Sequence, residues 1–217
     1  MPLEMSDHEQ QRRDKLERVR ARGIDPFPPR VKRTHTTAEA LAAWQAGALG
    51  EDSELSLAGR LVAIRVMGRS AFAHIADGEG RLQIYLRQEE VGEEAYNFFK
   101  QDFDLGDYVG ATGTLFSTRT GETTLRVRSF QMLAKAIRPL PVVKEKDGVV
   151  YDAFSDKEAR YRERYVDLNV NPHVREIFIK RAQIVSALRE YLDGQGFLEV
   201  ETPILQQVYG GAAARPF

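Results

Sequence analysis

Residues 70–87 alternate between apolar and polar side chains on both sides of a turn sequence, Asp77-Gly78-Glu79-Gly80. This alternation predicts a β-hairpin with one buried face. The inward face would carry Ala71, Ala73, Ile75, Leu82, Ile84 and Leu86. The outward face would carry Ser70, Phe72, His74, Arg81, Gln83, Tyr85 and Arg87. Such an outward face can stack on unpaired bases and bind phosphates, or it can be an ordinary half-exposed sheet with incidental aromatics.

The elements expected around the hairpin follow the order of a five-stranded Greek-key barrel of the OB type. A long strand over 55–66, with a bend or bulge at Gly59, should precede it. A helix over 89–103 and strands over 107–116 and 123–133 should follow. OB folds bind single-stranded nucleic acid or sugars on their central strands, which is where the outward row falls. We therefore favour the ligand face, within a mostly β domain over 55–134.

Residues 1–54 are expected to form a helical extension of this barrel. Ser6 and Glu9 form a capping-box pattern ahead of a helix that ends near Arg22, and a second helix is expected over 37–46. The first helix is rich in basic side chains: Arg12, Arg13, Lys15, Arg18, Arg20 and Arg22. This can be a solvated face, or it can contact phosphates through Arg12 and Arg18.

Residues 135–170 are interpreted as a linker, and a helix with a clear start follows. Asn171 is the expected N-cap and Pro172 the first helical residue. One stripe of this helix is apolar: Val174, Ile177, Phe178, Ile184, Val185, Leu188 and Leu192. A short strand over 197–201 should come next. A helix and a single strand cannot bury this stripe, so we expect a partner chain or further chain to cover it.

Composition excludes several classes of site. The chain has no cysteine, which rules out disulfides, thiolate metal sites and a cysteine nucleophile, and its four histidines are scattered. The net charge of −1 means that any nucleic-acid contact must be a local patch. The sequence shows no membrane-length apolar run and no signal-peptide core, so we expect a cytoplasmic protein without a metal site.

The C-terminal segments GFLEVETP (196–203) and GGAAARPF (210–217) resemble the first signature motif of class II aminoacyl-tRNA synthetases. The form is that of the bacterial-type lysyl-tRNA synthetases. Other matching segments extend the resemblance over nearly the whole chain: GIDPFP (23–28), MGRSAF (67–72), RLQIY (81–85), TGE (120–122), RPLP (138–141) and ARYRERYVDL (159–168). The segment 142–154 departs from the family, which usually has a shorter connection.

The resemblance implies that the OB barrel binds the anticodon loop of tRNA(Lys). Phe72 would stack on the central uracil, and Gln83 and Arg65 would hydrogen-bond to base edges. Glu122 would accept a hydrogen bond from a neighbouring base. The alternatives are an ion pair at the rim for Arg65 and a plain turn residue for Glu122.

The resemblance also implies a class II catalytic domain that begins at residue 171, with motif 1 as a homodimer interface. The interface residues would be Ile177, Phe178, Ile184, Leu188 and Pro203, and Gly211 and Ala212 would belong to the loop against the amino-acid substrate, or to a disordered end. Lysine, ATP and Mg²⁺ are the expected substrates and cofactor of the full enzyme, lysine–tRNA ligase. The second and third motifs would lie beyond Phe217, so we expect no catalytic residue and no aminoacylation in this chain alone. A stand-alone OB module that binds tRNA is the alternative function, and a barrel that binds carbohydrate or protein is a weaker one.

Overall fold

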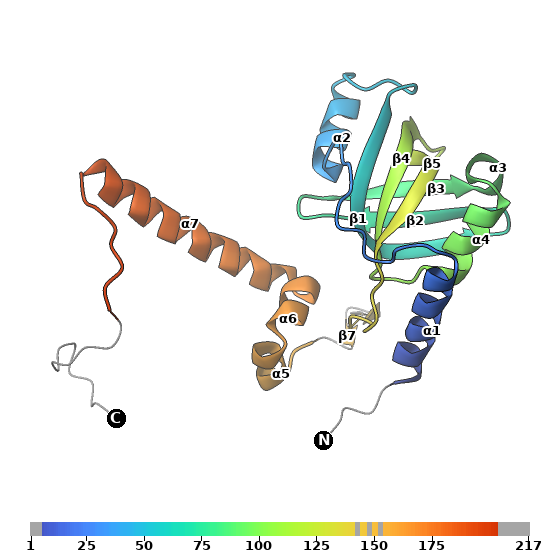
Figure 1. The fold of residues 1–217 in the computed structure, drawn as a ribbon. Helices are drawn as coiled ribbons and strands as arrows, with labels where there is room; N and C mark the ends of the chain where they lie inside the picture. The colour runs from blue at the N-terminus through green and yellow to red at the C-terminus, as the bar shows by residue number, and fades with distance from the viewer. Residues whose placement is uncertain (1–5, 142–143, 147–148, 152–153, 204–217) are drawn as a thin grey trace. The chain divides into compact units, whose positions relative to one another are not determined.

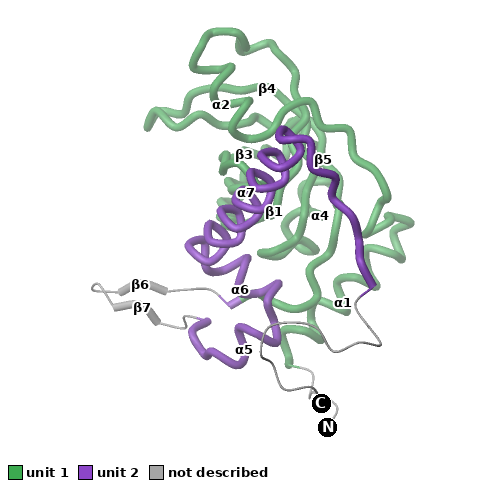
Figure 2. Tube along the Cα trace, turned by 90° about the vertical axis from the view of Figure 1, so that its left-hand side faces the viewer, with its two compact units in different colours: residues 1–140 green, residues 141–217 purple. Residues whose placement is uncertain are grey.

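The computed structural model describes residues 6–141, 144–146, 149–151 and 154–203. The chain divides into two compact units, Met1–Leu140 and Pro141–Phe217 (Figure 2). The finer division into four segments stays a prediction.

Five strands of the first unit form a closed barrel in the order β1-β2-β3-β5-β4 (Figure 1). Their bounds are Glu54–Met67 for β1, Ser70–Ala76 for β2, Arg81–Arg87 for β3, Tyr108–Ser117 for β4 and Thr123–Ala134 for β5. Strands β3 and β5 pair in parallel, and the other neighbours are antiparallel. The predicted OB-type barrel is confirmed.

The two faces of the β2–β3 hairpin are those that the alternation predicts. All six inward side chains are at most 2% exposed and belong to the hydrophobic core. Phe72 pairs with Tyr85 and His74 with Gln83 across the strands, so these four side chains share the outer face. The Asp77 amide donates to the Gly80 carbonyl over 3.1 Å and closes the turn.

The irregularity in strand β1 lies at a different place from the bulge predicted at Gly59. The register with β2 shifts between Leu61 and Ala63, and Gly59 lies in regular pairing. A Cβ at Gly59 would lie 3.0 Å from the carbonyl oxygen of Ala76 and 3.1 Å from Cβ of Ile75. Close approach of two strands therefore accounts for this glycine, and the predicted bulge there is wrong.

The single helix predicted over 89–103 is two helices, α3 (Gln88–Val91) and α4 (Glu93–Asp102). Gly92 separates them with a φ of 89°, a conformation that glycine adopts without strain. Helix α4 places Tyr96, Phe98 and Phe99 in the core, as the apolar spacing indicates.

Two helices precede the barrel, α1 (Asp7–Ala21) and α2 (Thr37–Gln45). The Ser6 hydroxyl accepts a hydrogen bond from the amide of Glu9 over 3.2 Å, and α1 buries the two apolar residues that the sequence offers, Leu16 and Val19. Helix α2 begins with a complete capping box between Thr36 and Glu39.

Helix α2 is attached to the turn between β2 and β3. The amide and the hydroxyl of Thr37 both donate to the Asp77 carboxylate over 2.8 Å. Burial raises the pKa of Asp77, but this effect is outweighed by hydrogen bonds from Thr37, Glu79 and Gly80, which leave the pKa below its ordinary 3.8. The turn is therefore held by an ionised carboxylate.

The second unit contains a two-stranded sheet and three helices within its described residues. Their bounds are Lys144–Lys146 for β6, Val149–Tyr151 for β7, Lys157–Arg162 for α5, Arg164–Val170 for α6 and Pro172–Gly194 for α7. Helices α5 and α6 lie within the segment expected to be a linker.

Asp167 joins the three helices of the second unit. Its carboxylate accepts hydrogen bonds from Arg160 over 3.0 Å, from Asn171 over 2.7 Å and from Arg164. Asn171 stands at the N-cap position of α7 as predicted, but its side chain makes no capping hydrogen bond; its amide nitrogen donates to Asp167 and to the carbonyl of Phe154.

The strand predicted over 197–201 is wrong. Residues 197–203 have no regular secondary structure, and no described strand pairs with them, whereas a strand is defined by its pairing. Among the described residues, no helix is both long and apolar enough to cross a lipid bilayer.

Candidate nucleic-acid interface

An open groove follows the outer faces of β2 and β3. The end of β1 lies along one side of it and the turn between β4 and β5 along the other. Seven of the side chains that line it carry its chemistry: Arg65, Phe72, His74, Gln83, Tyr85, Phe116 and Glu122. The groove therefore contains a set of aromatic side chains and a set of polar side chains.

The aromatic set is a row of rings that crosses three strands. Phe72 and Tyr85 are stacked, with centroids 4.5 Å apart and planes 28° apart. The ring of Phe116 follows 6.1 Å from Tyr85, tilted by 55°, and the guanidinium carbon of Arg126 lies 4.8 Å from the centroid of Phe116. A half-exposed ring that a second ring already supports offers a flat, ordered surface for an unpaired base.

The polar set is a chain of hydrogen bonds around Glu122. Gln83 Nε2 donates to Glu122 Oε2 over 2.8 Å, and His74 Nε2 lies 3.0 Å from Glu122 Oε1. The buried hydroxyl of Thr124 donates to Gln83 Oε1 over 2.8 Å. The amide of Gln83 is therefore oriented at both ends, with nitrogen toward the carboxylate and oxygen toward the hydroxyl.

The local sequence of the β4–β5 turn places Glu122 at the groove. The amide of Thr118 donates to the carbonyl of Glu122, and the amide of Glu122 donates to the hydroxyl of Thr118, each over 3.0 Å. Gly121 takes a φ of 84° between them, in the left-handed region that glycine favours. The turn is closed by its own contacts and presents the carboxylate toward β2 and β3.

The four residues predicted to read the anticodon, Arg65, Phe72, Gln83 and Glu122, all line this one groove. Arg65 is the Cα partner of Phe72 across β1 and β2, and its side chain is exposed. Their roles toward a base stay predictions.

The sequence placed His74 and Tyr85 on the outward face without individual roles. It gave no role to Phe116, which also lines the groove, or to Thr124 and Arg126, which contact its lining residues. The alternation of apolar and polar residues along β2 and β3 places His74 and Tyr85 on this outer face, so the sequence did carry a signal for these two. Thr124 and Arg126 are brought there by the parallel pairing of β3 with β5, for which the sequence carries no local signal, and Phe116 follows because β4 pairs with β5.

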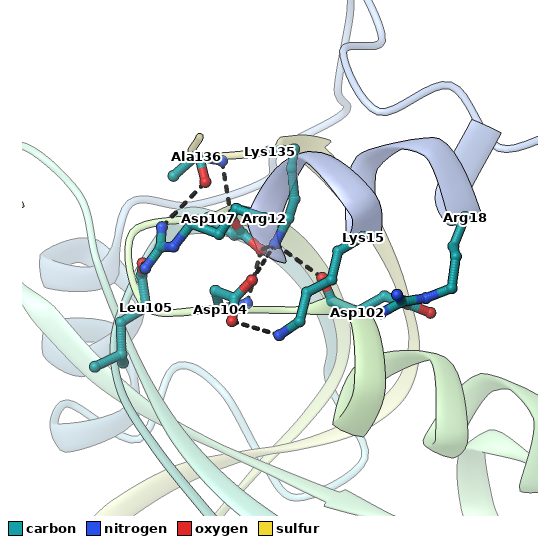
Figure 3. A network of polar contacts seen from close by, with 9 residues as sticks. All are labelled: Arg12, Lys15, Arg18, Asp102, Asp104, Leu105, Asp107, Lys135 and Ala136. Carbon is teal, nitrogen blue, oxygen red and sulfur yellow. Dashed lines mark hydrogen bonds and ion pairs between the residues drawn. The ribbon is translucent and has the colours of Figure 1, made fainter. Parts of the chain in front are cut away.

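The predicted phosphate contacts, Arg12 and Arg18, are not groove residues. Arg12 donates to the carbonyl oxygens of Ala136 over 3.0 Å and Leu105 over 2.9 Å. Arg18 Nε donates to Asp102 Oδ1 over 3.0 Å, and about half of its side chain is exposed. Both arginines attach α1 to the barrel unit (Figure 3). Contact with phosphate stays a prediction for both.

The same attachment contains a buried cation, Lys135 (Figure 3). Its ammonium group donates to Asp104 over 2.6 Å, to Asp107 over 2.7 Å and to the carbonyl of Asp102 over 2.9 Å. Burial raises the pKa of Asp107 above its ordinary 3.8, against the opposing effect of Lys135. Burial also tends to raise the pKa of Asp104. The hydrogen bonds and charges of Lys135 and Lys15 outweigh this effect, so the pKa of that carboxyl is lowered.

The residues predicted to form a dimer interface are exposed. On α7 the exposed fractions are 63% for Ile177, 38% for Phe178, 61% for Ile184 and 59% for Leu188. Pro203 is exposed as well, and Gly211 and Ala212 lie outside the described residues. An apolar stripe of this kind in solvent marks a surface for association.

The part of the chain that the structure describes contains no group of three or more histidine, aspartate or glutamate side chains that could hold a metal ion.

Comparisons with known proteins agree with both units. Residues 55–139 match the model of the OB-fold nucleic acid binding domain, and residues 156–217 match the model of class II tRNA synthetases of the D, K and N group. A lysine–tRNA ligase of Roseiflexus sp. (strain RS-1) is 49% identical over 216 residues, which is 99% of this chain. The chain spans 42% of the length of that relative.

Proposed function

This chain is homologous along 99% of its length to a lysine–tRNA ligase, and on that premise we propose that its 217 residues are a portion of a class II lysine–tRNA ligase that holds the anticodon-binding barrel and the start of the catalytic domain. The whole protein would join lysine to AMP with ATP and Mg²⁺ and transfer the lysine to the 3′ end of tRNA(Lys). We propose the cytoplasm as its location.

The observation that carries the proposal is the shared groove of Phe72, Gln83, Arg65 and Glu122. A base that stacks on Phe72 would be supported by Tyr85 from behind, and stacking contributes about 1–3 kcal/mol per base. Stacking tolerates every base, so it supplies affinity and leaves discrimination to the polar groups.

Gln83 and Glu122 supply the discrimination in this proposal. An amide can both donate to and accept from a base edge, and a carboxylate can only accept. In an anticodon loop the Watson–Crick edges are free for such contacts. The guanidinium of Arg65, exposed at the rim, would reach a base edge or a neighbouring phosphate.

Arg12 and Arg18 would add phosphate contacts that do not depend on the anticodon. Arg18 has the stronger support of the two, because only its Nε is bonded to Asp102 and half of the side chain faces solvent. Arg12 is half-buried, with two guanidinium nitrogens on carbonyl oxygens, so its main contribution would be to attach α1.

We propose that α7 mediates homodimerisation, with Ile177, Phe178, Ile184, Leu188 and Pro203 at the interface. The exposed apolar stripe of α7 supports this, because association of two copies would remove the apolar surface of these side chains from water. Gly211 and Ala212 would belong to the loop against the lysine substrate.

Binding of anticodon stem-loops tests the function directly. The chain should bind a stem-loop with the lysine anticodon more tightly than one with an altered central base, and equal affinities would refute base reading. A separate assay of the same purified 217 residues should give no lysyl-tRNA, and charging would refute the proposal that this part binds without catalysing.

A further inference from the structure

His74 holds the end of the polar chain in the groove. Its Nε2 lies 3.0 Å from Glu122 Oε1, and only 17% of its side chain is exposed. A carboxylate oxygen only accepts hydrogen bonds, so the proton of the imidazole must be on Nε2. The contact is therefore a hydrogen bond from the ring to the carboxylate, and it joins β2 to the β4–β5 turn.

The two oxygens of Glu122 are thus held by two different donors, His74 on Oε1 and Gln83 on Oε2. Glu122 is exposed and stands on a turn whose own hydrogen bonds involve the backbone of Glu122, not its carboxylate. Without these two donors the carboxylate would be free to rotate into solvent, at the cost of the ordering that recognition needs.

Gln83 cannot hold Glu122 and read a base with the same N–H. Its Nε2 has a second N–H and its Oε1 a second lone pair, so a base can engage the amide at these positions, whereas a base that takes the N–H now on Glu122 displaces the carboxylate from Gln83. When the amide nitrogen turns toward a base, His74 is the donor that remains on the carboxylate. The histidine contact would then decide whether Glu122 stays in the groove.

We propose that His74 is a positioning residue for base recognition: it keeps the Glu122 carboxylate directed into the groove so that the carboxylate accepts a hydrogen bond from a base that carries an N–H donor. The inference rests on the proposed anticodon function and adds a residue to it. The ligand chemistry is a donor edge, such as N3–H of uracil or an exocyclic amine, because the carboxylate offers only lone pairs.

The test compares stem-loops with uracil and with N3-methyluracil at each anticodon position in turn. Methylation removes one N–H and should weaken wild-type binding by about tenfold or more at the position that Glu122 reads, the usual effect of losing a hydrogen bond to a charged group. We compare the affinity for the unmodified stem-loop with that for the methylated one. In His74→Ala the ratio of these two affinities should fall to within about threefold of unity, at that position only. His74→Gln, which can place an N–H near Nε2, should restore most of the ratio.

Two further variants separate positioning from general damage. In a Glu122→Ala background, the change His74→Ala should have no additional effect on the ratio, since the group that it positions is gone. Phe72→Ala should weaken binding of methylated and unmodified stem-loops equally. If His74→Ala lowers the melting temperature, His74→Val, which keeps strand propensity and has no donor, takes its place.

The inference would be overturned if His74→Ala left the ratio of affinities for unmodified and methylated stem-loops unchanged. It would also be overturned if His74→Ala lowered this ratio equally in the presence and absence of Glu122. Either result would leave the proposed function intact. A wild-type chain that binds all stem-loops equally would instead overturn the proposed function, and this inference with it.

Discussion

Phe72 and Tyr85 lie directly opposite each other in the register of β2 and β3, and their rings stack at 4.5 Å. Strand pairing, rather than a loop, holds this pair. A base that arrives at the groove therefore meets an ordered surface, and little side-chain entropy remains to be lost on binding.

Phe72→Ala should weaken binding of the lysine anticodon stem-loop by about 1–3 kcal/mol, because the stacking surface is lost. The barrel should remain folded, since the ring lies on the outer face. Titration of the labelled stem-loop and a thermal melt measure the two effects. Phe27→Ala removes an exposed ring outside the groove and is the matched control, with unchanged affinity expected. Loss of the fold in Phe72→Ala would show that the assignment of faces is wrong.

Arg18→Ala should weaken binding of every tRNA by a similar factor, whatever its anticodon. If Arg18 contacts one phosphate, the slope of log affinity against log salt should fall by about 1. The control is Arg20→Ala, which removes an exposed arginine that pairs with Glu17 on the same helix. If Arg18→Ala lowered the stability of the protein but left the salt slope unchanged, Arg18 would serve only its contact with Asp102.

Lys135→Ala should destabilise the first unit by about 3–5 kcal/mol, since it leaves the buried Asp107 without its cation, while the half-buried Asp104 keeps Lys15. Urea denaturation followed by circular dichroism measures the free energy of unfolding. Lys100→Ala, at an exposed position of α4, should change it by no more than about 0.5 kcal/mol. A similar small change in Lys135→Ala would contradict the burial of this cluster.

Asp77 should make stability depend on pH in the acid range. Its folded-state pKa lies below the ordinary 3.8, so the folded state favours the ionised carboxylate. This contribution is full above pH 3.8 and is lost as the pH falls from that value through the folded-state pKa. The difference in unfolding free energy between wild type and Asp77→Asn, measured from pH 6 down to about 2, should shrink in that window. A difference independent of pH would contradict the shift.

Leu188→Glu should shift the chain toward monomer, because it places a charge in the proposed interface on α7. Sedimentation at several concentrations measures the dissociation constant. Lys180→Glu changes the charge of an exposed position on the same helix and is the control. An identical association constant for both variants would exclude Leu188 from the interface.

Local patterning was sufficient to predict the barrel. Alternation identified the inward residues of β2 and β3, and helical spacing identified Phe98 and Phe99 as core residues. The errors occurred where nonlocal contacts decide the structure. The bulge of β1 lies between Leu61 and Ala63 rather than at Gly59, and residues 197–201 form no strand, because both depend on which strands pair.

The candidate groove was predictable only in part, for the same reason. Phe72 and Gln83 follow from the faces of one hairpin. The contact of His74 with Glu122 spans 48 positions of sequence and forms because β3 pairs with β5 in parallel. Similarly, nothing in the basic composition of α1 shows that Arg12 is bonded to carbonyl oxygens of Leu105 and Ala136.

The attachment of α1 has a consequence for the order of events during synthesis. Its partners, Asp102, Leu105 and Ala136, follow Arg12 and Arg18 by 84–124 residues. A helix translated early must therefore wait, undocked and with Leu16 and Val19 in water, until the last barrel strand has left the ribosome. Ribosome-stalled chains in which Lys135 has not yet left the ribosome should leave α1 open to proteases, and chains long enough to expose Ala136 should protect it.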